Sequence, residues 1–352
     1  MWDEERLQKL AQAIPAWYKK THRSLPWRET KEPYRIWLSE IMLQQTRVEA
    51  VKGYYARFLE KLPTVESVAN ADDELLHKLW EGLGYYSRVR NLKKAAIVIM
   101  EKHGGRFPAD HADILNLPGI GPYTAGAIAS IAFNQKTPAV DGNVLRVLSR
   151  LCDDDRPVDT PQFKKEANEA LSRVYPDDAA DFTQGLMELG ATLCGPDKAP
   201  QCQMCPCKAF CKGKYRAEKL PVRSPKRQRR VEEKTVLILS CDGLLALSKR
   251  PPEGLLANLW QLPNYEGFMT TDQVLIQLKK EGIEPVDIEK QVHKKHIFTH
   301  IQWDMRGYYL RVKEPKGPYQ WFGSEKPALP TAFRQFIEDK TVGKQELSDS
   351  VL

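Results

Sequence analysis

The sequence predicts a multidomain α+β protein in which an all-α domain is followed by a small α/β domain. Up to about residue 193, apolar residues recur three and four positions apart in stretches that Pro or Gly separate, which is typical of amphipathic helices. After about residue 235, β-prone runs flank Asp242-Gly243, the dipeptide that most strongly signals a β-hairpin. The chain has 352 residues, which is enough for two or three domains.

Each helix of the first domain is predicted from its own apolar stripe. The expected helical ranges are 4–20, 33–62, 67–83, 88–105 and 161–175. A small-residue helix follows the glycine-rich stretch at 117–126, and another helix follows Asp141.

The second domain is expected to contain a hairpin over residues 235–251, a helix over 270–282 and β-like stretches over 296–312. The predicted boundaries are therefore 1–213 for the helical domain, 214–234 for an exposed basic linker and 235–345 for the second domain.

Composition and charge narrow the class of protein. No apolar run approaches the roughly 20 residues that a membrane span needs, and the start MWDEERLQKL lacks the basic and apolar regions of a signal peptide. We therefore expect a cytoplasmic protein without membrane contact. The net charge is +7, and residues 214–234 alone hold nine Lys or Arg against three Glu. Such a segment suits an anionic partner such as DNA, or else is a solvated linker, and both interpretations remain open.

The stretch LPGIGPYTAG at residues 117–126 suits an anion. Its glycines, which include Gly119 and Gly121, leave backbone N–H groups free to converge on a ligand, and the following helix adds its positive N-terminal end. The stretch lacks the Gly-Lys-Ser/Thr ending of a nucleotide-binding loop and follows no strand, so a DNA phosphate fits better than a nucleotide. The alternative is an ordinary tight turn between two helices.

Two carboxylates are candidates for chemistry. Glu40 shares a helix face with Ile36 and Leu43, so we expect burial to raise its pKa and to hold it as an acid near neutral pH, unless Arg35 or Arg47 pairs with it. Asp141 stands directly before a helix, where an N-cap is the simpler interpretation, and becomes a catalytic candidate only if the reaction needs a second carboxylate.

The cysteines predict a metal centre. Four of them, Cys194, Cys202, Cys205 and Cys211, enclose seven, two and five residues, whereas Cys152 and Cys241 stand alone. Four thiolates suit zinc or an iron–sulfur cluster, and the spacing does not choose between them.

An aromatic and basic segment follows the third helix. Tyr85 and Tyr86 lie among Arg88, Arg90 and the lysines at 93 and 94. This mixture suits stacking on bases and contacts with phosphates, but two tyrosines at the start of a helix more often serve packing.

The combination of these motifs resembles the helix-hairpin-helix DNA glycosylases of the endonuclease III type. Within this family, LPWR, WLSEIMLQQT, GLGYYSR, VDGNV and FTQGLMELGA are similar to the adenine DNA glycosylases. The resemblance implies an all-α catalytic domain with its helix-hairpin-helix near 112–130 and a [4Fe–4S] cluster loop at 194–211. It further implies a monomer that acts on double-stranded DNA carrying adenine opposite 8-oxoguanine or guanine.

The resemblance assigns roles to residues by position. It makes Glu40 the general acid that protonates the departing adenine and Asp141 the carboxylate that stabilises the positive sugar, with Tyr123 and Asn143 positioning them. The residues that match the pocket for the flipped adenine are Trp27, Arg28, Leu43, Gln184 and Glu188. The residues that match the wedge opening the duplex are Gln45, Thr46 and Tyr85. Gly119 and Gly121 would grip one DNA phosphate, and the four cysteines named above would hold the cluster.

The second domain resembles the Nudix (MutT-like) fold, with GLLANLWQLP as the closest likeness. It lacks the glutamate-rich box that binds magnesium in Nudix hydrolases, so we expect no pyrophosphatase activity. In the family a Phe-Ser-His turn contacts 8-oxoguanine, and this chain has Phe298, Thr299 and His300. The first cysteine gap is one residue longer than in the family, which makes Cys207 an alternative ligand.

Two other functions remain to be weighed. An endonuclease III-like glycosylase and lyase acting on oxidised pyrimidines would need an amine nucleophile, and its family places a lysine where this chain has Tyr123, which cannot form an imine. A catalytically idle DNA-binding protein with a structural metal would show no adenine release at all.

Overall fold

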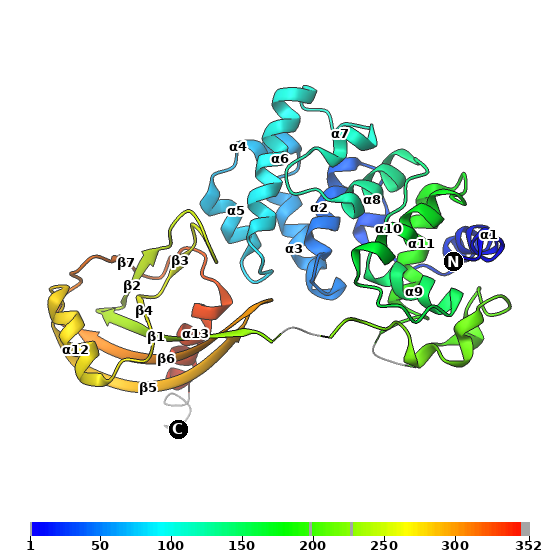
Figure 1. Ribbon diagram of the computed structural model, residues 1–352. Coiled ribbons are helices and arrows are strands. Elements are labelled where there is room, and N and C mark those ends of the chain that lie inside the picture. Colours follow the sequence, from blue (N-terminus) through cyan, green and yellow to red (C-terminus); the bar gives the residue numbers. More distant parts are fainter. Residues whose placement is uncertain (1, 197–198, 226–227, 346–352) are drawn as a thin grey trace, which may run out of the picture. The chain divides into compact units, whose positions relative to one another are not determined.

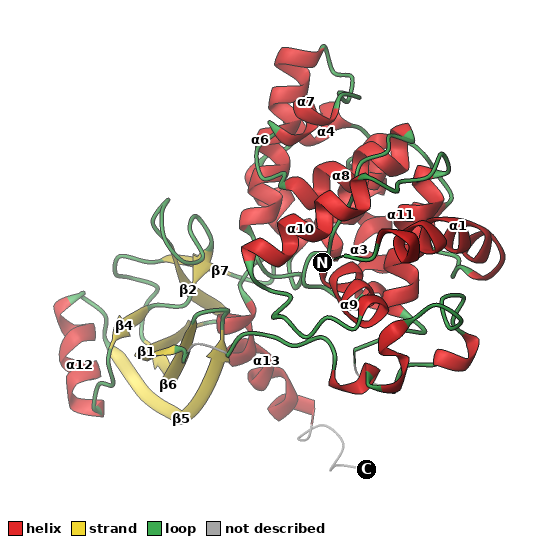
Figure 2. Cartoon of the chain, turned by 45° about the vertical axis from the view of Figure 1, so that its right-hand side comes forward, coloured by secondary structure: helices red, strands yellow, loops and turns green. Residues whose placement is uncertain are grey.

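The computed structural model describes residues 2–196, 199–225 and 228–345, and the chain forms two compact units (Figure 1). The first unit comprises residues 1–71 and 87–226, and the second comprises residues 72–86 and 227–352. Helices make up the first unit, and the sheet is confined to the second (Figure 2). The predicted class is therefore confirmed. The segment 72–86, which the sequence analysis kept in the first domain, belongs to the second unit.

The first unit is a helical array. In chain order it contains α1 (Glu4–Thr21), η1 (Pro26–Arg28), α2 (Pro33–Leu43), α3 (Val48–Lys61), α4 (Val65–Asn70), α6 (Ser87–His103), α7 (His111–Leu115), α8 (Pro122–Phe133), α9 (Gly142–Cys152), α10 (Pro161–Ser172), α11 (Ala179–Ala191), and the short 3₁₀ turns η2 (Cys202–Met204), η3 (Lys212–Tyr215) and η4 (Ala217–Lys219).

Two long predicted helices are divided in the structure. The range 33–62 breaks between α2 and α3, where Gln45 adopts a left-handed φ of 57°. The range 67–83 breaks because α4 ends at Asn70 and the Asp72 side chain caps a new helix by accepting from the Leu75 N–H. The apolar period is nearly continuous across both breaks, so periodicity alone does not reveal them.

The core of the first unit joins elements that are distant in sequence. Side chains of α1, α9, α10 and α11 pack together around Ile14, Leu148, Phe163 and Phe182. Helix α8 is buried nearly all round and lies so close to the following loop that a Cβ on Gly126 would meet the Pro138 carbonyl oxygen at 2.0 Å. The small residues of α8 therefore serve close packing.

The second unit is a sheet with a helix on each face. Its elements are α5 (Asp73–Trp80), β1 (Arg230–Cys241), β2 (Leu244–Lys249), β3 (Trp260–Gln261), β4 (Asn264–Glu266), α12 (Thr271–Lys280), β5 (Pro285–Ile297), β6 (Ile301–Val312), β7 (Gln320–Phe322) and α13 (Thr331–Gln345). The strand order is β3-β2-β1-β6-β5, with β4 paired to β1 and β7 to β2.

The register of β1 explains the two cores. Strand β1 runs parallel to β6 from Arg230 opposite Ile301 onward, and its neighbouring residues face opposite sides of the sheet. Val236 and Ile238 pack with α13 residues, whereas Leu237 and Leu239 pack with Val274 and Leu278 of α12. The predicted hairpin at Asp242-Gly243 and the helix near 270–282 are confirmed, with φ values of 45° and 80° in the turn. The short strands β3, β4 and β7, most of β5 and the helix α13 were not anticipated.

The basic linker differs from its expected exposure. The Leu220 side chain is 2% exposed, and its carbonyl accepts a hydrogen bond of 2.9 Å from Arg150. Farther on, the Val222 carbonyl accepts from the Val158 N–H, and β1 begins as early as Arg230. Apolar residues spaced within the basic run bury themselves against the helices, which net charge alone does not reveal. No helix in the described residues is long and apolar enough to cross a bilayer.

Candidate active site

A cavity of about 180 Å³ lies among the helices of the first unit. Its lining includes eight of the residues singled out in the sequence: Trp27, Arg28, Glu40, Leu43, Thr46, Tyr123, Asn143 and Gln184. They come from η1, α2, α8, α9 and α11 and from the turn after α2, so only the packing of these elements assembles the cavity.

Glu40 is the acid of this cavity. It lies on α2, is 6% exposed and accepts a hydrogen bond of 2.5 Å from the Tyr123 hydroxyl. Burial raises the pKa of Glu40 to about 7, although the Tyr123 hydrogen bond acts in the opposite direction, and the nearby Asp141 charge raises it further. The partner is thus Tyr123 from α8, and neither of the arginines that the sequence offered. Near neutral pH, this carboxyl can hold a proton and give it up.

Asp141 is the N-cap of α9, and its charge acts on the Glu40 carboxyl. Its side chain accepts hydrogen bonds of 2.7 Å from the Val144 N–H and of 2.7 Å from the Asn143 side-chain amide. Burial raises the pKa of Asp141, while these hydrogen bonds lower it. The cap that the local sequence predicted is therefore present, and it also fixes the carboxylate beside the cavity.

Asn143 links Asp141 to the cysteine segment. Its side-chain oxygen accepts a hydrogen bond of 2.7 Å from Arg146, whose Nε donates to the Cys194 carbonyl at 2.9 Å. Gly190 packs so tightly on Asn143 that an added Cβ would lie 2.6 Å from the Asn143 Cβ. Both neighbours hold the Asn143 amide in place toward Asp141.

Two arginines fix Glu188, which is 1% exposed and is not among the residues that line the cavity. Its oxygens accept hydrogen bonds of 2.8 and 2.7 Å from Arg23 and of 2.7 Å from Arg28. Burial would raise the pKa of Glu188, but these arginines outweigh it and hold the pKa at about 2. Arg23 also lines the cavity and was missed in the sequence, because an arginine between a helix and LPWR carries no local signal of its partner 165 residues away.

Two residues assigned to the wedge have unusual backbones. Gln45 has a φ of 57° and Tyr85 a φ of 47°, in the left-handed region that residues other than glycine rarely adopt. The Tyr85 ring is 46% exposed, whereas Tyr86 and Arg88 are buried. In the aromatic and basic segment, Tyr85 is therefore exposed, whereas Tyr86 and Arg88 are each buried. Its burial removes Arg88 from the residues expected to contact phosphates.

The glycine loop forms the turn that leads into α8. Gly119 has a φ of 75°, and a Cβ there would lie 2.5 Å from the Asn91 Cβ, so both conformation and space require glycine. Gly121 is the N-cap of α8 without a side-chain cap, and open space surrounds it. The first N–H groups of α8 are therefore available to an anion.

Tyr123 and Asp141 contribute to the lining of a second cavity, of about 730 Å³. Its lining includes Pro122 at the start of α8 and the cations Lys164, Lys165 and Arg223. Tyr123 lines both cavities, whereas Glu40 lines the smaller one and Asp141 the larger one.

The cysteine segment packs against the core of the first unit. Cys194, Cys205 and Cys211 contact this core, and Arg150 donates to the Cys194 sulfur at 3.3 Å. Burial and the charges of three other cysteine thiolates, at positions 205, 194 and 202, raise the pKa of Cys211 to about 12. The described part of the chain, which lacks residues 197 and 198 of this segment, shows no group of three or more His, Cys, Asp or Glu that could hold a metal ion.

Cys207 is enclosed by this segment. It is buried, and its N–H donates to the Cys205 sulfur at 3.4 Å. The other four cysteines of the segment offer soft thiolate donors, and Arg150 beside the Cys194 sulfur suits an anionic metal–sulfur group. By their chemistry, these residues therefore fit an iron–sulfur cluster.

The remaining predicted residues lie in the second unit and do not line the 180 Å³ cavity. Phe298, Thr299 and His300 form the turn between β5 and β6, where the Phe298 ring packs edge-on against Trp303 at 4.9 Å. Thr299 and His300 are exposed. Within the same unit, the Tyr85 and Thr299 hydroxyls form a hydrogen bond of 3.1 Å. Two residues that the sequence assigned to different tasks thus meet.

The segment LKKEG (residues 278–282) is all that remains of a Nudix box, and the described residues form no acidic cluster there that could hold a metal ion. Its remaining carboxylate, Glu281, accepts hydrogen bonds of 2.5 and 2.6 Å from the hydroxyls of Tyr265 and Tyr319. Exposed Ile276 lies on the same helix. The acid that remains serves the packing of this domain.

Family comparisons match both units. A family described as HhH-GPD superfamily base excision DNA repair proteins matches residues 38–175, and the NUDIX domain family matches residues 235–339. Among solved structures, a thermostable thymine-DNA glycosylase has a TM-score of 0.54 and 29% identity, covering 60% of this chain and 97% of that one. An endonuclease III–DNA complex shares the fold with a TM-score of 0.52 at 23% identity, over 62% of this chain and 100% of that one.

Curated relatives carry one common name. The adenine DNA glycosylase of Buchnera aphidicola from Acyrthosiphon pisum is 33% identical over 94% of this chain and 97% of its own length. Those of human and Arabidopsis thaliana are each 35% identical over 86% of this chain. The chain spans 66% of the human relative and 57% of the plant relative.

Proposed function

Because this chain belongs to the adenine DNA glycosylases, which are base excision repair enzymes, we propose that it removes adenine paired with 8-oxoguanine or guanine and leaves an abasic site. The observation that carries this proposal is a carboxyl with a pKa of about 7, Glu40, buried in a cavity beside a second carboxylate, Asp141. Cleavage of an N-glycosidic bond needs a proton for the leaving base and a negative charge for the positive sugar.

The proposed reaction begins when adenine leaves the stack and enters the 180 Å³ cavity. Protonated Glu40 gives its proton to a ring nitrogen of adenine as the bond from N9 to C1′ breaks, and adenine departs neutral. Asp141 stabilises the positive charge at C1′. Water then adds to C1′ and loses a proton to the Glu40 carboxylate, which restores the acid.

The identity of Tyr123 supports base removal without strand cleavage. A phenol cannot form the imine that a lyase uses, and its hydroxyl is already engaged with Glu40 at 2.5 Å. Burial and the neighbouring carboxylates raise the pKa of Tyr123, so it stays protonated and keeps donating. We therefore propose a monofunctional glycosylase, in contrast to an endonuclease III-like lyase.

The other site assignments extend this proposal. Trp27, Arg28, Leu43, Gln184 and Glu188 would receive the adenine, and Gln45, Thr46 and Tyr85 would fill the space it leaves in the duplex. The turns at Gly119 and Gly121 would hold a phosphate at the start of α8. The hydrogen bond between Tyr85 and Thr299 supports a common site in which both residues contact the base opposite adenine.

We also propose that Cys194, Cys202, Cys205 and Cys211 hold a [4Fe–4S] cluster. When bound, such a cluster would link four thiolates of the segment to one another. It would also add a local charge, and hydrogen bonds to the sulfur atoms would tune its reduction potential. Arg150 and Arg146, which donate to the Cys194 sulfur and carbonyl, would offset the cluster's negative charge. The proposed enzyme is a monomer acting on double-stranded DNA in the cytoplasm.

The deciding experiment incubates the protein with a duplex carrying adenine opposite 8-oxoguanine. We expect free adenine from the wild type, strand breaks only after alkali, and a loss of activity of about 10²–10⁴-fold or more in Glu40→Gln. Strand breaks without alkali would favour the lyase, and no adenine release by the wild type would favour an idle DNA-binding protein. A duplex with an oxidised pyrimidine is the control substrate.

A further inference from the structure

Helix α2 ends directly before the turn that contains Gln45, here called the wedge turn (residues 44–46). The last carbonyl groups of a helix have no partner within it. The Nη1 of Arg88, which comes from the start of α6, lies 2.7, 3.0 and 2.7 Å from the carbonyl oxygens of Ile41, Met42 and Gln44. One guanidinium nitrogen therefore binds both the end of α2 and the first residue of the wedge turn.

The wedge turn itself is held on both sides of Gln45. The Thr46 N–H donates to the Leu43 carbonyl at 3.3 Å, and the Thr46 hydroxyl donates to the Gln44 carbonyl at 3.3 Å. The second nitrogen of Arg88, Nη2, lies 3.5 Å from the Thr46 hydroxyl oxygen. These contacts enclose the residue whose φ of 57° needs support from its surroundings.

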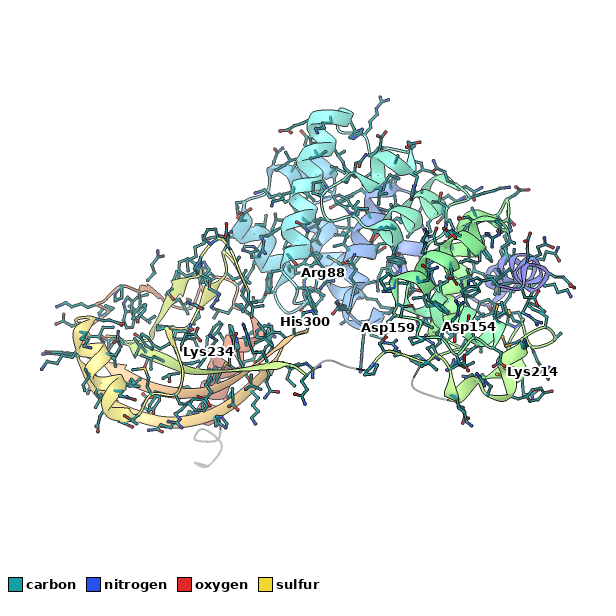
Figure 3. The ribbon with its side chains drawn as sticks, in the orientation of Figure 1. Arg88, Asp154, Asp159, Lys214, Lys234 and His300 are labelled. Atoms are coloured by element: carbon teal, nitrogen blue, oxygen red, sulfur yellow. The ribbon has the colours of Figure 1, made fainter. Side chains whose placement is uncertain are left out.

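Arg88 is suited to this place by its charge and shape. It is 9% exposed and lies among helices of the first unit (Figure 3). A buried cation is costly unless carbonyl dipoles surround it, and the C-terminal end of α2 supplies them together with the negative end of the helix dipole. Its side chain reaches the wedge turn from a different helix, so it joins α6 to the end of α2.

We propose that Arg88 is a positioning residue that holds the wedge turn in the shape in which Gln45 enters the duplex. This inference rests on the proposed function, since it assumes that Gln45 fills the space that adenine leaves. In this role Arg88 acts through the carbonyls of Ile41, Met42 and Gln44 before Gln45 and through the Thr46 hydroxyl after it.

A purely structural role would act differently, because α2 also carries Glu40. If Arg88 only stabilised α2, its loss would displace Glu40 and slow the chemistry on every substrate. If it positions the wedge turn, its loss slows excision only where adenine must be forced out of the stack. Two substrates and a pH profile separate these roles.

The experiment measures single-turnover rates of adenine release for Arg88→Met, Arg88→Lys and Gln45→Ala. One duplex pairs adenine with 8-oxoguanine, and the other places adenine opposite a stable abasic-site analogue, where unstacking costs less. We expect Arg88→Met to lose about tenfold or more on the paired duplex, because a strained turn that is no longer held relaxes, and to lose less than about threefold on the other. Arg88→Lys should recover part of the rate, because an ammonium also donates to carbonyls.

A double variant gives the sharpest result. If Arg88 acts through Gln45, the combination of Arg88→Met with Gln45→Ala should be no slower than the slower single variant. The midpoint of the pH–rate profile, set by Glu40, should stay where the wild type has it. The control is Arg156→Met, which removes an exposed ion pair with Asp154 and Glu166 and should leave both rates unchanged.

Four outcomes would overturn the inference. Equal losses on both substrates with a shifted pH midpoint would show that Arg88 acts on Glu40. Additive losses in the double variant would show that Arg88 and Gln45 act separately. Full activity of both Arg88 variants would show that the wedge turn does not need Arg88. A wild type that is inactive on both substrates, but folded, would instead overturn the proposed function and this inference with it.

Discussion

At the scale of single residues, the chemistry depends on the environment of Glu40. A glutamate in water is ionised at neutral pH, and burial beside another carboxylate brings the pKa of Glu40 to about 7. Tyr123 moderates this effect, because its hydrogen bond favours the ionised form. The rate of adenine release should therefore follow the protonated fraction of Glu40 and fall as the pH rises through about 7.

Tyr123→Phe tests this dependence. Removal of the hydroxyl takes away a hydrogen bond that lowers the pKa of Glu40, so this pKa should rise. The decline in rate should move to higher pH by about half to one unit. Single-turnover rates between pH 5 and pH 9 measure this shift, with the unaltered wild type as reference. A midpoint that moves to lower pH would contradict this prediction, because it would show that the Tyr123 hydroxyl raises the pKa of Glu40.

Glu40→Gln tests the same carboxyl through stability. The pKa of Glu40 is raised in the folded state, so its contribution to stability is fully present below its ordinary value of 4.5 and is lost as the pH rises through about 7. At pH 8 the neutral glutamine should make the protein at least as stable as the wild type while removing its activity. Urea unfolding at pH 8 checks this, and a clear loss of stability would show that the ionised carboxyl is well accommodated.

At the scale of elements, the loop before α8 separates two uses of glycine. Gly119→Ala should lower the free energy of unfolding by about 1–3 kcal/mol, because φ is 75° and the new Cβ would press on Asn91. Gly121→Ala has an extended φ of −100° and open space, so stability should change by less than about 0.5 kcal/mol.

The two substitutions should have the opposite order of effect on DNA binding, with the larger loss of affinity in Gly121→Ala. If a phosphate lies against the first N–H groups of α8, the methyl group in Gly121→Ala takes part of its space and weakens DNA binding in a well-folded protein. Thermal unfolding and fluorescence anisotropy with labelled duplex measure the two effects. Unchanged DNA affinity in Gly121→Ala would remove the phosphate from this position.

The turn between β5 and β6 is the corresponding element of the second unit. Phe298 packs on Trp303, and the Trp303 indole N–H donates a hydrogen bond of 2.9 Å to Glu232. These contacts hold the Phe298 end of the turn in place, while Thr299 is exposed. The long cross-strand pairing of β5 and β6 places this turn at one end of the sheet. Its length and position were readable in the sequence, but its hydrogen bond to Tyr85 was not.

At the scale of the whole molecule, discrimination should depend on the second unit. Thr299→Ala should reduce the preference for adenine opposite 8-oxoguanine over adenine opposite guanine by about 3–10-fold, the value of one hydrogen bond. Thr299→Ser keeps the hydroxyl and is the matched control. Competition between the two duplexes in one reaction measures the ratio. An unaltered ratio in Thr299→Ala would assign the discrimination to other residues.

The cysteine segment is tested by its metal content. Wild-type protein should contain iron and acid-labile sulfide in equal amounts, and Cys211→Ala should lose most of both. Cys152→Ala lies outside the segment and should retain them, while Cys207→Ser decides whether the extra thiol replaces one of the four ligands. Zinc in place of iron would replace the proposed cluster with a structural zinc site.

The sequence by itself determined the type of most elements of the first unit, the hairpin of the second unit and the supply of reactive groups. Apolar periods predicted most helices, Asp242-Gly243 predicted the hairpin, and a glutamate on an apolar helix face predicted a buried acid. These features depend on residues a few positions apart, where local sterics and hydrogen bonds act.

Only the tertiary structure decided which groups meet. Tyr123 reaches Glu40 across 83 positions, and Arg23 reaches Glu188 across 165. Arg88 looked like a surface cation in the sequence, yet packing places it under the end of α2. The physical reason is that local patterns set which face of a helix is buried, whereas the packing of helices far apart in the chain sets what that face contacts.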